Sequence, residues 1–242
     1  MRVSQEESEK GCLDGVVGAA DGLFVKTAAP ATSFECLDQL SYYSEERKRY
    51  GINVQAIATA NPCFIAVEVT HPGEANDSSA YLGSSLPEAT AALPSGFHVV
   101  GDAAYPLSEK LLTPYAREGL VDEEHDVFNF HLNQLRIKAE QSFWTVLQTW
   151  GVLWKPIRLR HAKRAGVIEA LFRLHNYLQD EKVEVVPFEE EDARAQALRP
   201  AAGNDNRLPP RFKAPQSSAA IMSGDETPAR EFLRRSMATL GL

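Results

Sequence analysis

Three short runs of apolar residues in the first third of the chain predict β-strands. Residues 15–27 form a mostly apolar, β-branched run that is interrupted by glycine and by one acidic residue, Asp21. Residues 53–58 and 63–70 are two further β-rich runs, joined by a segment with the composition of a tight turn. We therefore expect three consecutive antiparallel strands, with an irregular connection over residues 28–50.

A short helix and a fourth strand are expected next. Asn76 and Asp77 are both suited to cap the N-terminus of a helix, and the sequence that follows them is compatible with one. Residues 96–101 (GFHVVG) predict a strand that ends immediately before Asp102. Asp102 is thus expected at the C-terminal end of a strand.

The following stretch predicts two longer helices. Between residues 132 and 150, apolar residues recur at spacings of three and four, as in an amphipathic helix. Glu140 falls on the same face as these apolar residues, so we expect its carboxylate to point inward. A second helix is expected over residues 159–179. The apolar positions that share the face of Glu140 are Ile137, Phe143 or Trp144, and Leu147.

The order of these elements predicts one α/β domain with a tail at either end. We expect an N-terminal tail over residues 1–14 and a single domain over residues 15–182. Residues 183–224 combine an acidic run with Pro, Ala, Asn and Ser, a composition typical of a disordered linker. Residues 225–242 contain the sequence TPAREFLRRSMATL, which predicts a short C-terminal helix.

Composition limits the classes of function. The 242 residues are 44% hydrophobic, enough for a sizeable core, and carry a formal net charge of −8. Such a charge argues against a protein that coats nucleic acid through bulk positive charge, so any DNA contact should be local. The three cysteines form no C-x-x-C pair, and no stretch approaches the length of a membrane span. A soluble protein of a reducing compartment is expected.

Three carboxylates lie where an isolated charge is costly. Asp21 interrupts an apolar strand, Asp102 ends another, and Glu140 lies on the apolar face of a helix. A hard divalent cation would balance all three, because Mg²⁺ and Mn²⁺ prefer carboxylate oxygens and water. Each acid also has a simpler interpretation: Asp21 with Gly22 could form a turn, Asp102 could cap the loop after its strand, and Glu140 could pair with Arg136 at spacing i,i+4.

Six blocks of sequence, in a fixed order, make the chain similar to a known family. The region from about residue 18 to residue 178 resembles the PIF/Harbinger-type DDE superfamily endonucleases, which are transposase-derived nucleases. The blocks are residues 18–22 (GAADG); 47–48 with 50–56 (YGINVQA); 72–73 with 76–78; 101–107 (GDAAYPL) with 112–115 (LTPY); 128–129 with Arg136, Glu140 and Phe143; and 174–176 (LHN).

The resemblance implies a fold and a set of site residues. It implies a ribonuclease H-like mixed sheet flanked by helices, with Asp21, Asp102 and Glu140 as the catalytic acids that hold Mg²⁺ or Mn²⁺. Asp77 falls on the family's H-D pair and is a candidate auxiliary acid, although a helix cap is the simpler role for it. The resemblance also implies residence in the nucleus.

The chain departs from the family pattern at several positions. Leu23 stands where the family usually has Thr, Asn76 where it has His, and Gln148 where it has Lys. The family's helix-turn-helix DNA-binding region would precede Asp21, so we expect a truncated or domesticated copy. A domesticated copy could depend on a separate DNA-binding protein.

Two groups of basic residues are candidates for DNA contact. They could line a phosphate track beside the acids, or they could be ordinary solvated charges on an acidic protein. Trp144, Trp150 and Trp154 are expected to pack in the core, and His175 to be a hydrogen-bonded structural residue. The basic residues are Arg47, Lys48 and Arg49 in the first group and Lys155, Arg158 and Arg160 in the second.

The sequence leaves two functional hypotheses from different classes. The first is an enzyme, a metal-dependent DNA endonuclease that hydrolyses phosphodiester bonds by a two-metal mechanism. The second is a catalytically silent, domesticated protein that keeps the fold as a binding or scaffolding module. The presence of all three acids favours the first hypothesis. Gln148, which stands where the family usually has Lys, favours the second.

Overall fold

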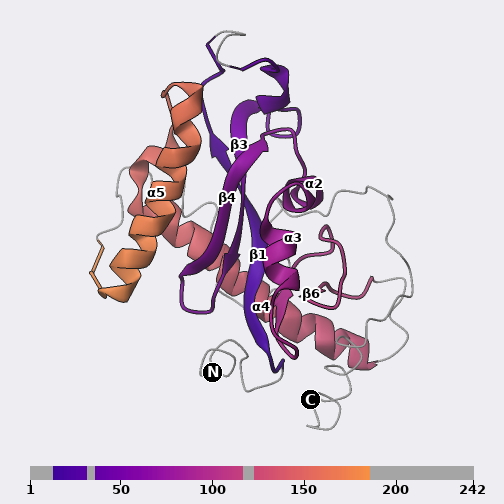
Figure 1. Cartoon of the computed structure of the whole chain (residues 1–242). Helices are drawn as coiled ribbons and strands as arrows, with labels where there is room; N and C mark the ends of the chain where they lie inside the picture. Colours follow the sequence, from indigo (N-terminus) through magenta and orange to yellow (C-terminus); the bar gives the residue numbers. More distant parts are fainter. Residues whose placement is uncertain (1–12, 32–35, 117–122, 186–242) are drawn as a thin grey trace.

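The computed structural model of the protein describes residues 13–31, 36–116 and 123–185. Within these ranges a six-stranded sheet has the order β2-β3-β1-β5-β6, and β4 also pairs with β3 (Figure 1). Four helices longer than a single 3-10 turn accompany it in the same ranges. The strands are β1 (Val16–Lys26), β2 (Tyr43–Ser44), β3 (Arg49–Ala58), β4 (Phe64–Pro72), β5 (His98–Val100) and β6 (Leu111–Leu112).

The pairing of the strands is mixed, as predicted. β1, β3 and β4 follow one another as antiparallel neighbours. β5 then joins the other side of β1 in parallel, and β6 is parallel to β5. An antiparallel meander extended by parallel strands is the mixed sheet expected from the sequence, so the α/β, ribonuclease H-like fold class is confirmed.

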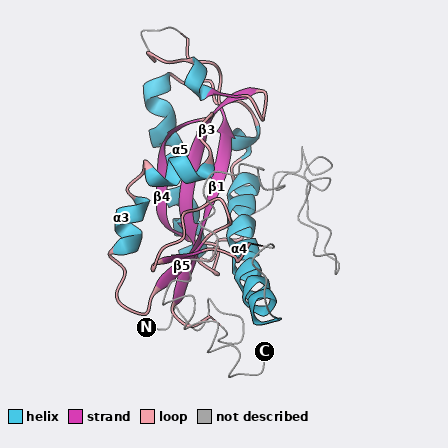
Figure 2. Ribbon diagram, turned by 90° about the vertical axis from the view of Figure 1, so that its right-hand side faces the viewer, coloured by secondary structure: helices cyan, strands magenta, loops and turns pink. Residues whose placement is uncertain are grey.

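Helices cover both faces of the sheet. The two short helices, α2 and α3, lie on one side of the strands, and α4 and α5 lie on the other (Figures 1 and 2). The helices are α2 (Asp77–Leu82), α3 (Leu86–Ala91), α4 (Glu123–Thr149) and α5 (His161–Asp180), with 3-10 turns η2 (Leu40–Tyr42) and η4 (Gly151–Trp154).

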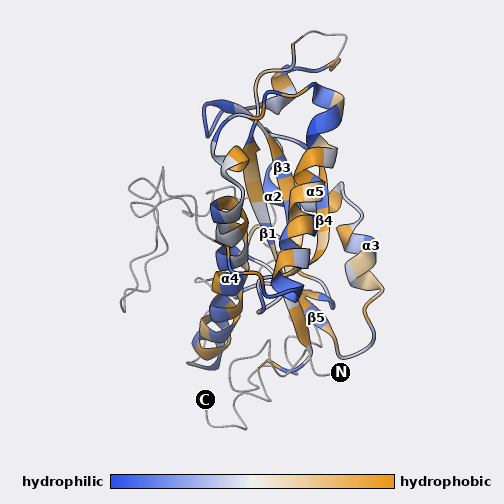
Figure 3. Ribbon diagram, turned by 90° about the vertical axis from the view of Figure 1, so that its left-hand side faces the viewer, coloured by the Kyte–Doolittle hydropathy of each residue, from blue (hydrophilic) through white to orange (hydrophobic). Residues whose placement is uncertain are grey.

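Each face of the sheet has its own buried cluster. Alternate residues of β1 point to opposite faces, so Ala19 and Val25 pack with α4 and α5, whereas Ala20 packs with α2 and α3. Figure 3 shows that α4 alternates hydrophilic and hydrophobic residues along its length, as expected for a helix with one face on the core. Asp21 therefore points to the α4 side of the sheet, and its neighbour Gly22 faces the α2 side.

Some boundaries differ from those predicted. β3 begins at Arg49, within the stretch predicted to be irregular, and β6 has no counterpart among the predicted strands. α4 begins at Glu123 rather than near Leu132. A two-residue strand such as β6 carries no periodic signal, because it exists only through its pairing with β5.

The predicted apolar face of α4 was right for most of its positions and wrong at Ile137. Phe143 is buried and Leu147 packs against the core on the face of Glu140, whereas Ile137 is 37% exposed. Apolar residues lie on more than one face of this long helix, so spacing alone did not exclude Ile137 from the stripe. The core-facing residues are Phe128, Leu132, Leu135, Ala139, Phe143 and Val146.

Side-chain hydrogen bonds attach α5 to the β3–β4 hairpin. Asn176 accepts from the Phe64 N–H at 2.9 Å and donates to the Phe64 carbonyl at 2.7 Å. His175 is fully buried, and its Nε2 lies 2.6 Å from the Pro62 carbonyl oxygen. His175 is thus a structural residue, as predicted, and the LHN block serves to dock a helix.

Some of the remaining predictions concern residues that the structure describes, and others concern residues outside those ranges. Of the three tryptophans expected in the core, Trp150 is half-buried against it, while Trp144 and Trp154 are half-buried, lie outside both core clusters and meet each other edge to face. No helix within the described ranges is both long and apolar enough to cross a membrane. The predicted tail, linker and C-terminal helix lie outside the described residues, apart from residues 13–14 and 183–185.

Candidate active site

The pairing of β1 with β5 brings two acidic residues level with each other. The parallel register aligns Ala19 of β1 with Val100 of β5. Asp21 and Asp102 each follow two residues after this pair, and neighbouring strands lie about 4.8 Å apart. The topology of the sheet therefore brings these two acids to the same end of the pairing between β1 and β5.

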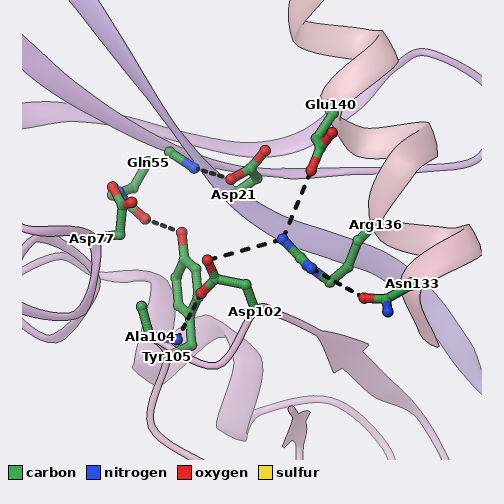
Figure 4. Close-up of polar contacts among 10 residues, drawn as sticks. Asp21, Gln55, Asp77, Asp102, Ala104, Tyr105, Asn133, Arg136 and Glu140 are labelled. Atoms are coloured by element: carbon green, nitrogen blue, oxygen red, sulfur yellow. Dashed lines mark hydrogen bonds and ion pairs between the residues drawn. The ribbon is translucent and has the colours of Figure 1, made fainter. Parts of the chain in front are cut away.

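α4 brings the third acid to the same place. The helix packs on β1 through core residues that include Ala139, and Glu140 follows at the margin of that contact with its side chain 18% exposed. Glu140 and Arg136 extend from α4 toward Asp21 and Asp102 (Figure 4). The three acids predicted from the sequence thus come from three separate elements and face one region.

Arg136 lies between two of these acids. Its Nη2 is 3.9 Å from Asp102 Oδ2 and 3.7 Å from Glu140 Oε1, and its Nη1 donates to Asn133 Oδ1 at 3.2 Å. The i,i+4 pair of Arg136 with Glu140 considered from the sequence is therefore present. Its separation exceeds the roughly 2.7–2.9 Å of a charge-assisted hydrogen bond.

Asp21 lies inside β1, and the interpretation of Asp21-Gly22 as a turn is wrong. Its Oδ1 accepts from the Gly22 N–H at 2.8 Å. Burial raises the pKa of Asp21 well above its ordinary value, the nearby Glu140 raises it further, and Arg136 opposes both effects. The ionised form of Asp21 is thus disfavoured unless a cation balances it.

The two carboxylate oxygens of Asp102 have different partners, one in the loop after β5 and one in the site. Its Oδ1 accepts from the Ala104 N–H at 2.8 Å, so the predicted capping role is real. Its Oδ2 is the oxygen that faces Arg136. Burial raises the pKa of Asp102, and Arg136 lowers it in part. The cap therefore leaves one carboxylate oxygen directed at the site.

Glu140 has an oxygen without a hydrogen-bond partner. Its Oε1 is buried and accepts no hydrogen bond within the described part of the chain. Burial raises the pKa of Glu140, while Arg136 lowers it and Asp102 raises it. A buried carboxylate oxygen of this kind costs free energy unless a cation or donor reaches it.

Asp77 has a different role from the helix cap considered for it. Asn76 is the N-cap of α2, because its side chain accepts from the Ser79 N–H at 2.8 Å. The Asp77 carboxylate instead accepts from Gln55 Nε2 at 2.9 Å and from Asn53 Nδ2 at 3.1 Å. Two amides of β3 thus hold a fourth carboxylate close enough to Asp21 and Asp102 to raise the pKa of each.

The amides that hold Asp77 belong to a buried network that the sequence reasoning missed. Tyr105 donates its hydroxyl to Gln55 Oε1 at 2.6 Å, and Gln55 also donates to Asn53 Oδ1 at 2.9 Å. Asn53 and Gln55 alternate with apolar residues in β3, so they share one face of the strand. Two amides on one face of an otherwise apolar strand were the signal that could have revealed this network.

Gly22 leaves room for that network. A Cβ at Gly22 would overlap Asp77 Oδ1 and would lie 2.7 Å from Gln55 Nε2. Because real Cβ atoms do not approach other atoms so closely, a side chain here would displace Asp77 or Gln55. The glycine of the D-G block therefore allows an acid and an amide to approach the main chain of β1.

The donor set suits a hard divalent cation. Carboxylate oxygens from β1, the end of β5 and α4 share one region, and Glu140 Oε1 has no donor among the described residues. In the described ranges, no group of three or more His, Cys, Asp and Glu side chains is already drawn together at metal-binding geometry. Arg136 Nη2 lies within 4 Å of both Asp102 Oδ2 and Glu140 Oε1.

The two basic groups meet at one end of β1. Thr27 donates its N–H to the Tyr50 carbonyl on one side and forms a parallel bridge with Ile157 on the other. Arg49 and Arg158 are the neighbours of these two flanking residues and are exposed. The other predicted basic residues, Arg47, Lys48, Lys155 and Arg160, are also exposed.

Comparison with known proteins identifies the family. A family model described as DDE superfamily endonuclease matches residues 20–176, a span that contains Asp21, Asp102 and Glu140. No curated protein and no solved structure gives a significant match. Because the family match covers more than half of the 242 residues and agrees with the fold, this chain belongs to the DDE superfamily endonucleases.

Proposed function

We propose that the protein is a metal-dependent DNA endonuclease derived from a transposase of the PIF/Harbinger type. The observation that carries this proposal is the convergence of Asp21, Asp102 and Glu140 from β1, the end of β5 and α4. Three acids with raised pKa values in one place make a site that favours a cation.

The three acids would be ligands at two metal positions. Asp21 in β1 and Asp102 two residues after the end of β5 would share Mg²⁺ or Mn²⁺ ions, and Glu140 would complete the second position. Two bound ions about 4 Å apart activate a water and stabilise the leaving oxygen of a phosphodiester. Asp77 lies beyond Gly22 on the α2 side of the sheet and is proposed as an auxiliary acid.

The chain's own residues would position the substrate. Arg49 and Arg158 lie near Thr27, which is six residues, or about 20 Å, from Asp21 along β1. That distance corresponds to about six nucleotides of one strand of B-form DNA. A duplex with a phosphate at the acids would therefore reach the basic end of the sheet half a turn later. Water would attack the phosphodiester, or a DNA 3′ hydroxyl if strand transfer is retained.

Nicking of supercoiled DNA tests the proposal. The wild-type chain should nick the plasmid in Mg²⁺ or Mn²⁺ but not in a chelator, and Asp102→Asn should abolish nicking. Asp126→Asn is the matched control, because Asp126 is exposed on α4 away from the acids and should retain activity. Equal nicking by wild type and Asp102→Asn would refute the assignment of the acids.

One observation favours the second hypothesis, a catalytically silent scaffold. Arg136 lies 3.9 Å from Asp102 and 3.7 Å from Glu140 and offsets part of their negative charge. A scaffold would depend on a separate DNA-binding protein and would not need to bind metal. Calorimetric titration with Mn²⁺ separates the two functions, because heat of binding that is lost in Asp102→Asn is expected only of the nuclease.

We also propose that the protein acts in the nucleus, where its DNA substrate lies. Imaging of the tagged full chain in a eukaryotic cell tests this expectation. Exclusion of the tagged chain from the nucleus would contradict it.

A further inference from the structure

Arg136 is close to two acids without being hydrogen-bonded to either. Its Nη2 lies 3.7 Å from Glu140 Oε1 and 3.9 Å from Asp102 Oδ2. The guanidinium therefore makes no bidentate fork with either carboxylate, which is the arrangement that makes Arg pairs strong and specific. Its Nη1 donates a hydrogen bond to Asn133 Oδ1 at 3.2 Å, one helical turn away.

The position of Arg136 is nonetheless buried. The residue is 8% exposed, and Glu140 Oε1 is a buried oxygen without a hydrogen-bond donor among the described residues. A buried guanidinium is retained where it balances nearby negative charge. Here that charge belongs to the acids assigned to the metal ions, so Arg136 and a divalent cation would be counter-ions for the same carboxylates.

We propose that Arg136 is a placeholder cation, which balances Asp102 and Glu140 in the metal-free protein and is displaced from them when a divalent ion enters. This inference rests on the proposed metal-dependent function. The long separations from the acids make displacement easy, since no strong hydrogen bond has to break. Asn133 remains available to Nη1 when Nη2 moves away.

A second ion pair in the chain supplies a matched control. Arg173 of α5 pairs with Glu169 at the same i,i+4 spacing and at 2.5 Å. The Arg173 side chain is 78% exposed, and the pair lies far from the acids in the sequence and on another helix. Removing Arg173 therefore tests the general effect of losing a helical ion pair.

The experiment measures Mn²⁺ affinity and metal-free stability of the full chain. Isothermal titration compares wild type with Arg136→Gln, Arg136→Lys and Arg173→Gln. Loss of the competing charge should make Arg136→Gln bind Mn²⁺ about tenfold more tightly, within the usual range of coupling between two ligands. Arg136→Lys and Arg173→Gln should bind Mn²⁺ as wild type does.

Thermal denaturation in the presence of a chelator is the second measurement. Removal of Arg136 should lower the metal-free Tm, although it should raise the affinity for Mn²⁺. Arg136→Gln should have a lower Tm than wild type without metal, because the acids lose their counter-ion, and a larger rise in Tm on adding Mn²⁺. If Arg136→Gln unfolds without metal, circular dichroism during Mn²⁺ addition should show recovery of helix. Arg136→Lys should restore the metal-free Tm.

The outcomes separate failure of this inference from failure of the proposed function. Equal or weaker Mn²⁺ binding by Arg136→Gln, with wild type binding normally, overturns the placeholder role and leaves the metal site standing. Binding by Arg136→Gln alone supports the placeholder role and argues that the native chain is a silent scaffold. No binding by any variant overturns both.

Discussion

At the scale of single residues, the buried acids of this site oppose folding when they are ionised. Asp21 lies on a central strand, and burial raises its pKa well above the ordinary value. An acid with a raised pKa in the folded state is destabilising once it ionises, because the unfolded chain solvates the charge better. Arg136 offsets this cost only in part. A metal-free chain should therefore gain stability when the charge at Asp21 is removed.

Substitution Asp21→Asn should stabilise the metal-free chain at pH 8. A stabilising substitution commonly contributes about 0.5–2 kcal/mol, and about 1 kcal/mol moves the Tm of a chain of this size by about 2–4 °C. Between its unfolded and folded pKa values, Asp21 binds more protons in the native state, so stability falls as pH rises through that window. The gain should therefore shrink as the pH is lowered toward the ordinary pKa of Asp. Melting curves in chelator at several pH values measure it, and a lower Tm for Asp21→Asn at pH 8 would contradict it.

Substitution Gly22→Ala should destabilise the protein. The new Cβ would overlap Asp77 Oδ1 and crowd Gln55 Nε2, and such overpacking costs about 1–3 kcal/mol. Gly166→Ala is the control, because Gly166 lies within α5 with nothing near the position of a Cβ. That control should stabilise the chain by about 0.5–1 kcal/mol. Chemical denaturation of both variants measures the difference in sign.

The sequence pointed to three of the site residues because each broke a local pattern. Asp21 and Asp102 stood out against apolar strands, and Glu140 against a helical stripe. Gln55 and Tyr105 escaped notice, since a neutral amide and a phenol do not violate an apolar pattern as a charge does. Their role depends on a hydrogen bond between residues 50 positions apart, which only the folded sheet supplies.

At the scale of elements, α5 is attached to the sheet by polar contacts to main chain. The Asn176 side chain satisfies both the N–H and the carbonyl of Phe64 at the start of β4. The rings of Phe64 and Phe172 meet edge to face beside this contact. The docking of the helix thus combines a directional pair of hydrogen bonds with apolar packing.

Substitution Asn176→Leu should loosen this docking. It leaves the N–H and carbonyl of Phe64 without partners, and an unsatisfied buried polar group costs about 1–3 kcal/mol. Arg173→Leu on the same helix is the control, because the Arg173 side chain is exposed and surface changes are usually within about 0.5 kcal/mol. Urea denaturation should separate the two variants, and equal stability would refute the anchoring role.

The elements themselves were only partly predictable. The strands that became β1, β3 and β4 carried a clear pattern, and the existence of α4 and α5 followed from helical spacing. The full membership of the α4 core face did not follow, because Ile137 and Ala139 are both apolar and only the packing on β1 selects Ala139 for the core. β6 depends wholly on β5.

At the scale of the whole molecule, charge is distributed unevenly. The net charge is −8, yet exposed basic residues on either side of Thr27 gather at one end of β1. Local cations of this kind fix a duplex by its phosphates even when the overall charge is unfavourable. The sequence suggested both basic groups, but their proximity rests on the bridge between Thr27 and Ile157, which no periodic pattern encodes.

The double substitution Arg49→Ala with Arg158→Ala should weaken binding of duplex DNA. Fluorescence anisotropy in an Asp102→Asn background avoids cleavage during the measurement. The slope of log K against log salt should fall by about 1 for each phosphate that the double variant no longer neutralises. Arg173→Ala is the control, because it removes an exposed Arg on α5 and should leave the slope unchanged. An unchanged slope in the double variant would contradict the proposed track.

The register between β1 and β5 has a consequence for how this site tolerates genetic change. The register aligns Ala19 with Val100 through main-chain pairing, two residues before Asp21 and Asp102, so a point substitution of either acid changes its side chain but not this alignment. Deletion of one residue between Val16 and Asp21 would instead turn the carboxylate toward α2, since a shift of one position exchanges the faces of a strand. Frame-preserving indels within this strand should thus abolish nicking, as Asp102→Asn should, even when all three acids are still encoded.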